Sequence, residues 1–227
     1  MKIFRFFRKI IIIFIAISLF FVCLFRFIDP PGTMLMLEQK MGNFDKKQQR
    51  TWRDFNDISD NIKIAVIAAE DQNFANHFGF DLRAIEQAIT HNENNQTIRG
   101  ASTITQQVAK NLFLWPSRSF VRKAFEFWFT LWIELFWSKQ RTLEIYLNSV
   151  EWGEGIFGIQ AASHHYFHTS ANNLTLDEAC LLAAILPNPR NLSPVNPNEN
   201  IRNKANWIKK QIQNLDKNTY LKEINDD

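Results

Sequence analysis

Two carboxylates stand side by side at the end of an apolar run. Glu70 and Asp71 follow the residues AVIAA, so at least one of them is expected to be partly shielded from water. Burial and a neighbouring acid both disfavour the ionised carboxylate, which makes such a group a proton acceptor near neutral pH. The pair is a candidate general base, although paired acids at a helix end are more often solvated groups that hold a turn.

A second segment combines a glycine, hydroxyl groups and cations. Gly100 permits a close approach of backbone and ligand, and Ser102 and Thr103 stand at the expected start of a helix. Free backbone N–H groups and hydroxyls at such a start suit an anionic or sugar ligand. Lys110 follows two turns later, and the next cations are Arg118, Arg122 and Lys123. Simple capping of an amphipathic helix would explain the hydroxyls without a ligand.

A third carboxylate, Glu126, stands one helical turn after Arg122. Such a pair on an exposed helix face stabilises the helix by only about 0.2–0.5 kcal/mol. Residues 120–137 are apolar nearly all round, which is typical of a helix buried in protein or touching lipid. Burial in the core is the default interpretation, and on so apolar a helix a charged cluster needs a partner.

All of these groups lie on or beside segments whose apolar residues repeat with the period of a helix. No segment of useful length alternates apolar and polar residues as a β-strand does. Ser59 or Asp60, Asp81, Ser102 or Thr103, and Ser138 are candidate N-terminal caps. Thr175 with Glu178 has the spacing of a capping box. The predicted helices cover residues 62–74, 81–92, 103–112, 119–137, 138–148, 157–167, 176–186 and 199–213, with a flexible joint at 153–158. The expected body is a single, mainly α domain.

The N-terminus predicts a membrane anchor. Residues 10–25 carry no charge and span roughly 24 Å as a helix, close to a bilayer core of about 30 Å once Phe27 and Ile28 are added. Four basic residues precede the run and no small-residue cleavage site follows it, so an uncleaved anchor is favoured over a signal peptide. The basic flank predicts a cytoplasmic N-terminus and an external body.

Composition excludes several classes of protein. The net charge of +3 comes from the N-terminal bases, and the rest of the chain is slightly acidic, which argues against a nucleic-acid-binding domain. Two cysteines cannot form a disulfide framework or a cysteine zinc site, and we expect Cys23 and Cys180 to be small buried apolar groups.

The predicted organisation is a basic tail (1–9), an anchor (10–28), an irregular linker (29–58), a catalytic domain (59–215) and a polar C-terminal tail (216–227).

Five segments together resemble the peptidoglycan glycosyltransferases in order and spacing. They are EDQNFANHFGFD (70–81), RGASTITQQVAKNLF (99–113), RKAFE (122–126), YLNSVEWGEGIFGIQAASHHYF (146–167) and LTLDEACLLAAILPNP (174–189). The resemblance implies a lysozyme-like fold and polymerisation of lipid II into glycan strands with release of undecaprenyl diphosphate. The anchor, and a chain that ends soon after the fifth segment, indicate a monofunctional member in the inner membrane of a Gram-negative bacterium, with its catalytic domain in the periplasm.

The resemblance also implies residue roles. Glu70 matches the catalytic base and Glu126 a second catalytic carboxylate, which either positions the cations or helps a divalent ion, Mg²⁺ or Mn²⁺, to bridge the diphosphate. No organic cofactor is implied. Asp71 and His77 are expected to shape the turn around Glu70. The expected substrate site comprises Asp71, Phe74, His77, Gly100, Ser102, Thr103, Gln106, Gln107, Lys110, Arg118, Arg122 and Lys123.

Two departures and two rival interpretations remain. Cys180 replaces an expected small residue, and His164, His165 and His168 form a local group that we interpret as solvated or capping. A lysozyme-like hydrolase would need no cations for a diphosphate, and a membrane-tethered scaffold would need no base. Other cell-wall synthases and division proteins are further candidate partners.

Overall fold

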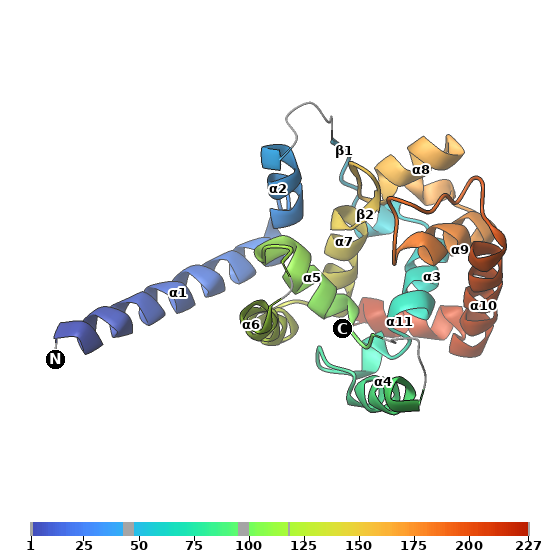
Figure 1. The fold of residues 1–227 in the computed structure, drawn as a ribbon. Coiled ribbons are helices and arrows are strands. Elements are labelled where there is room, and N and C mark those ends of the chain that lie inside the picture. Colours follow the sequence, from blue (N-terminus) through green and yellow to red (C-terminus); the bar gives the residue numbers. More distant parts are fainter. Residues whose placement is uncertain (1, 43–47, 95–99, 118, 227) are drawn as a thin grey trace.

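Helices dominate the computed structural model, which describes residues 2–42, 48–94, 100–117 and 119–226 (Figure 1). The helices are α1 Lys2–Phe27, α2 Met34–Gly42, α3 Asp60–Glu70, α4 Leu82–Asn94, α5 Ile104–Phe113, α6 Phe120–Phe136, α7 Lys139–Ser149, α8 Ile159–Phe167, α9 Leu176–Ile185, α10 Glu199–Leu215 and α11 Lys217–Asp226. The strands are β1 Gln49–Arg50, β2 Glu151–Gly153 and β3 Ile156–Phe157. The predicted mainly α class is confirmed.

The strands form one small sheet in the order β1-β3-β2, with β1 parallel and β2 antiparallel to β3. It replaces the flexible joint that the sequence predicts at 153–158. Gly158, which follows β3, has a φ of +78°, and a Cβ there would lie 2.9 Å from the carbonyl oxygen of Asn148. The turn into α8 therefore requires glycine.

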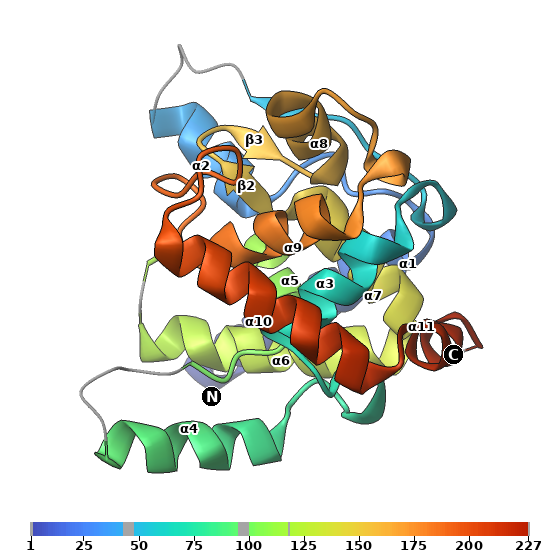
Figure 2. The same ribbon diagram turned by 90° about the vertical axis from the view of Figure 1, so that its right-hand side faces the viewer.

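The helix α3 lies at the centre of the body, where α9 and α10 pack against it (Figure 2). Its apolar residues Ile62, Ile64 and Ile67 are fully buried. Ser59 caps the helix by accepting a hydrogen bond from the backbone N–H of Asn61. The helix ends at Glu70, earlier than the predicted 74, and a separate 3₁₀ turn follows at Phe74–Asn76. Glu70 is consequently the last helical residue beside a buried core.

Capping explains where several other helices begin. The predicted capping box at Thr175 and Glu178 is present at α9, and a second box joins Thr103 and Gln106 at α5. Ser138 caps α7, as its position in the sequence predicts. These local hydrogen bonds satisfy backbone N–H groups that have no partner within the helix.

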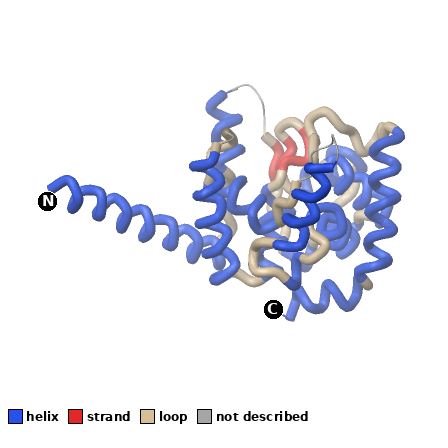
Figure 3. Tube along the Cα trace, turned by 60° about the horizontal axis from the view of Figure 1, so that its bottom comes forward, coloured by secondary structure: helices blue, strands red, loops and turns tan. Residues whose placement is uncertain are grey.

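The helix α1 projects from the body, as Figures 1 and 3 show, and packs against α6 through its C-terminal half. Residues 3–27 are long and apolar enough to cross a membrane. The ring of Phe14 contacts Phe125, Trp128 and Phe129 of α6.

Two indole N–H groups complete this contact, one on α6 and one on Trp137, the residue that ends it. The indole of Trp128 donates a hydrogen bond to Ser18 Oγ at 3.1 Å, and that of Trp137 donates to the Val22 carbonyl at 2.7 Å. Cys23 is exposed, so the expectation that both cysteines are buried is wrong for it and holds for Cys180. Val22 faces α6, and the next residue on a helix turns about 100° away from it.

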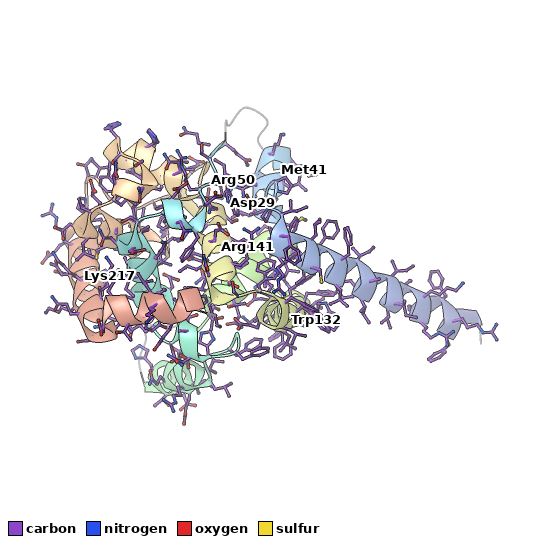
Figure 4. All side chains as sticks on the ribbon, turned by 180° about the vertical axis from the view of Figure 1, so that it is seen from behind. Asp29, Met41, Arg50, Trp132, Arg141 and Lys217 are labelled. Atoms are coloured by element: carbon purple, nitrogen blue, oxygen red, sulfur yellow. The ribbon has the colours of Figure 1, made fainter. Side chains whose placement is uncertain are left out.

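An arginine of α7 also holds the base of α1. Arg141 donates to the carbonyl oxygens of Phe25 and Ile28 at 3.1 and 3.0 Å and forms an ion pair with Asp29 at 2.9 Å (Figure 4). The anchor is thus fixed to the body through α6 and α7, rather than joined to it by a linker alone.

Other expectations need correction. The predicted irregular linker contains α2 and β1, and the predicted polar tail is the helix α11. Tyr220, Leu221 and Ile224 of α11 are buried, because their spacing places them on one helix face. The helix α6 is only partly a core helix: Phe129 and Ile133 are buried, whereas its outer face exposes Phe120, Val121, Phe127 and Leu135.

Candidate active site

Glu70 lies at the end of α3 with its side chain partly exposed. The Gln107 side-chain amide, on α5, donates a hydrogen bond from Nε2 to Glu70 Oε2 at 2.8 Å. Gln107 was expected to contact a sugar or a phosphate, and the structure places its amide on the carboxylate instead. A neutral donor orients the carboxylate and leaves it free to accept a proton.

Asp71 is structural rather than exposed to a ligand. Its carboxylate is buried and accepts from His77 Nε2 at 2.8 Å and from the backbone N–H of Ile104 at 3.0 Å. It therefore ties the turn after α3 to the start of α5, in agreement with the expected shaping role of Asp71 and His77. Both of its oxygens accept hydrogen bonds from protein groups, and the expected contact of Asp71 with the substrate stays a prediction.

Phe74 was expected to contact the substrate, but its ring lies in the hydrophobic core beside the site. Its side chain has no exposed area, so it supports the site only by packing. The His77 ring meets it edge-on, and Lys139 Nζ lies 4.9 Å from its ring centre. Buried aromatic rings of this kind hold a loop in place.

The start of α5 lies beside this loop. Thr103 is buried and donates from its hydroxyl to the Gly79 carbonyl oxygen at 2.7 Å, while it also caps α5. Gln106 is buried in the capping box, so its amide oxygen is held by the backbone of Thr103. Gly100 and Ser102 are exposed just before the helix and remain open to a ligand. Thr103 thus acts on the site by positioning α5.

The cations gather around the second carboxylate. Glu126 is 3% exposed and accepts from Arg122 Nη1 at 2.8 Å and from Lys123 Nζ. The charge of Lys110 interacts with the charges of both Glu126 and Glu70, so it is close enough to feel each carboxylate. Burial lowers the pKa of Lys110, and the negative charge of Glu126 partly restores it. Arg118 lies outside the described residues.

A cavity of about 770 Å³ opens next to this cluster. Gln106 and Lys123 contribute polar groups to its wall, and Phe80 stacks on Phe127 at a ring separation of 4.7 Å. The remaining lining is mixed: Phe78, Leu82 and Ile85 are apolar, whereas the other residues are polar or charged, namely Asn73, Asn76, His77, Asp81 and Arg83. A cavity with apolar surface and a few polar and charged groups suits a ligand that has both apolar and polar parts.

Comparison with known proteins gives this geometry its context. The sequence model of the transglycosylase family matches residues 37–213. The chain belongs to the transglycosylase family. Its expected class, a mainly α lysozyme-like enzyme with an N-terminal apolar helix, is confirmed.

Curated relatives agree over nearly the whole chain. A protein of Pseudomonas fluorescens Pf-5, named biosynthetic peptidoglycan transglycosylase, is 50% identical over 98% of this chain and 95% of its own length. Proteins with the same name from Pseudomonas savastanoi pv. phaseolicola and Pseudomonas aeruginosa PAO1 are 51% and 49% identical, over 96% and 97% of this chain and 94% and 97% of their own lengths. The family resemblance read from the five segments is confirmed.

The transglycosylase site includes groups that sequence reasoning missed. Tyr146 is the first residue of the fourth segment, and its hydroxyl donates a hydrogen bond to Gln107 Oε1 at 3.3 Å. Lys204, on α10, interacts with Glu70, and burial lowers its pKa. Glu134 forms a buried ion pair with Lys139 and accepts a hydrogen bond from the Thr105 hydroxyl. Tyr146 could have been singled out as a polar group in a matching segment, but nothing local indicates Lys204.

The donor set does not fit a divalent ion held by the protein. Both oxygens of Glu126 are bound to cations, and the described residues contain no group of three or more His, Cys, Asp and Glu side chains that could hold a metal. Glu126 therefore fits the first of its two expected roles, that of positioning cations. A divalent ion carried by the diphosphate of the substrate stays a prediction.

Proposed function

We propose that this transglycosylase polymerises lipid II into linear glycan strands and releases undecaprenyl diphosphate. The observation that carries the proposal is the pairing of a carboxylate oriented by a neutral amide, Glu70, with a separate cation cluster held by the buried Glu126. One carboxylate is available to take a proton, while the cations stand where a departing anion would need them. The names of the relatives support peptidoglycan as the product.

In the proposed reaction Glu70 is the general base. Its carboxylate takes the proton of the acceptor 4-hydroxyl as that oxygen attacks the anomeric carbon of the donor. A new carbon–oxygen bond forms, the bond to the diphosphate breaks, and the diphosphate leaves with the electron pair, so the α-linked donor gives a β linkage. A positioned general base contributes about 10²–10⁴-fold to such a step.

The cations serve the leaving group. Charge develops on the diphosphate as its bond to the sugar breaks, and fixed positive groups stabilise that charge in the transition state. Lys110 and Lys123 supply ammonium groups, and Arg122 Nε–H has no hydrogen-bond partner among the described residues. Glu126 keeps these like charges together while neutralising only part of their charge.

The membrane arrangement follows from the substrate and the anchor. A single apolar helix, with a basic N-terminal flank, supports one crossing of the inner membrane with a cytoplasmic N-terminus and a periplasmic catalytic domain. The lipid tail of the substrate would then lie in the same membrane as α1. Other cell-wall synthases and division proteins stay predicted partners.

The test incubates the detergent-solubilised full chain with fluorescent lipid II, with and without Mg²⁺, and separates the products on a gel. A ladder of glycan that muramidase degrades, absent in Glu70→Gln, is the expected result. Release of labelled fragments from preformed glycan without a ladder would instead indicate a hydrolase. Intact lipid II with folded parent protein would indicate a scaffold.

A further inference from the structure

The hydroxyl of Tyr146 is buried next to the site but does not reach the proposed base. Tyr146 is 1% exposed and lies on α7, and its hydroxyl donates to Gln107 Oε1 at 3.3 Å. Gln107 in turn donates from Nε2 to Glu70 Oε2 at 2.8 Å. Three side chains from three helices thus form a chain of hydrogen bonds that ends at the carboxylate.

The two ends of the Gln107 amide are chemically different, because one is a donor and the other an acceptor. If the amide turned over, Oε1 would face the Glu70 carboxylate, and two acceptors would repel each other. In the observed orientation Nε2 donates to Glu70 and the Tyr146 hydroxyl donates to Oε1, so the amide is held at both ends. Turning the amide would break the bond to Glu70 and force the hydroxyl to accept a hydrogen bond instead of donating one.

We propose that Tyr146 is a positioning residue that fixes the Gln107 amide in the orientation that donates to Glu70. The proposal rests on the proposed function, since it assigns Glu70 as the base. A donated hydrogen bond favours the ionised carboxylate, which is the form that accepts the proton. Tyr146 thereby keeps the donor end of the Gln107 amide on the base.

The surroundings keep this hydroxyl a donor. Burial and the negative charges of Glu70 and Asp71 raise the pKa of Tyr146 well above its usual range, so it stays protonated. Lys110 on α5 and Lys204 on α10 also interact with Glu70. Removing the Tyr146 hydroxyl changes none of these charges, so a change in kcat can be assigned to the hydrogen bonds.

The test compares Tyr146→Phe with the parent in lipid II polymerisation. We expect kcat to fall about three- to ten-fold, as for the loss of one hydrogen bond. The KM for lipid II should change little. Tyr166→Phe is the matched control, because the Tyr166 hydroxyl donates to the Trp152 carbonyl at 3.1 Å, away from this chain of bonds. It should keep the parental kcat and KM.

A second variant separates positioning from simple stability. Gln107→Leu removes the donor that Tyr146 orients, and it should also lower kcat with little change in KM. In the Gln107→Leu background, Tyr146→Phe should cause no further loss of kcat, because coupled residues are not additive. Full additivity, a parental kcat in Gln107→Leu, or a parental kcat in folded Tyr146→Phe would each overturn the proposal.

Glu70→Gln in the same assay distinguishes failure of this proposal from failure of the proposed function. If Glu70→Gln is inactive while Tyr146→Phe behaves as the parent, Glu70 remains the base and the positioning role is wrong. If Glu70→Gln polymerises lipid II at the parental rate, the assigned base is wrong, and the positioning role falls with it.

Discussion

At the residue scale, the surroundings of the two carboxylates assign their roles. Glu70 has a neutral amide as its hydrogen-bond partner and keeps some exposure, whereas Glu126 is buried with both oxygens on cations. A carboxylate held between two cations is a poor proton acceptor, because protonation would break both ion pairs. Two acids of the same type are thus suited to different tasks by their neighbours.

The role of Glu126 predicts a change in pH dependence. Burial lowers the pKa of Lys110 and Glu126 raises it, so Glu126→Gln lowers that pKa further. Lys110 must be charged to stabilise the diphosphate, and its charge is lost as the pH rises through its pKa. Polymerisation by Glu126→Gln should therefore fall about ten-fold, with the basic limb of the pH–rate profile moved to lower pH.

Polymerisation at the parental rate with an unmoved basic limb would refute the cation-positioning role of Glu126.

At the element scale, α5 is the helix that presents the site, since it carries both Gln107 and Lys110. Its start is fixed by the capping box at Thr103, by the Thr103 bond to Gly79 and by the bond from Ile104 N–H to Asp71. The capping box of α9, at Thr175, is exposed and far from these groups along the chain. The two boxes are a natural pair for comparison.

Thr103→Ala and Thr175→Ala should separate stability from activity. Loss of a cap costs about 1 kcal/mol of unfolding free energy, so chemical denaturation should show a decrease in both variants. The decrease should be larger for Thr103→Ala, which also loses the bond to Gly79. Only Thr103→Ala should lower lipid II polymerisation, because α5 carries the site residues Gln107 and Lys110, whereas none of the site residues lies on α9. Equal activities in the two variants would contradict this account of α5.

At the scale of the whole molecule, the anchor is part of the catalytic body. Phe14, Ser18 and Val22 of α1 contact α6, and Arg141 holds the end of the same helix. The helix α6 also carries the cations Arg122 and Lys123. A change in α1 can therefore reach the site through the position of α6.

Replacing residues 3–24 by an unrelated apolar helix of equal length tests this connection. The chimera should insert in the membrane but show a lower thermal midpoint in detergent and a lower rate of lipid II polymerisation, because the contacts to α6 are lost. The control exchanges Ile10, Ile11 and Phe20 for leucine, since these side chains are exposed and the residues facing α6 are kept. Parental rate and midpoint in the chimera would show that α1 is only a tether.

Local patterns predicted the helices well and their contacts poorly. The capping box at Thr175 and the cap at Ser138 follow from a few adjacent residues, so sequence suffices for them. The apolar face of α11 is short and lies in a polar segment, so it was missed. The contact between Glu70 and Gln107 joins residues far apart in the chain.

The family resemblance supplied the identity of the site residues but not always their roles. It placed Phe74 at the substrate, whereas packing buries that ring completely. It placed Gln107 on a sugar or a phosphate, whereas the folded chain turns its amide to Glu70. Such details depend on how helices pack, which no single segment of sequence determines.

The most direct test of the central claim separates binding from chemistry in Glu70→Gln. Lipid II binding is measured by titration, and glycosyl transfer is measured in a single turnover with enzyme in excess. The account predicts parental affinity with transfer slowed at least about 100-fold, as for the loss of a general base. Transfer at a rate close to that of the parent would contradict the assignment of Glu70 as the base.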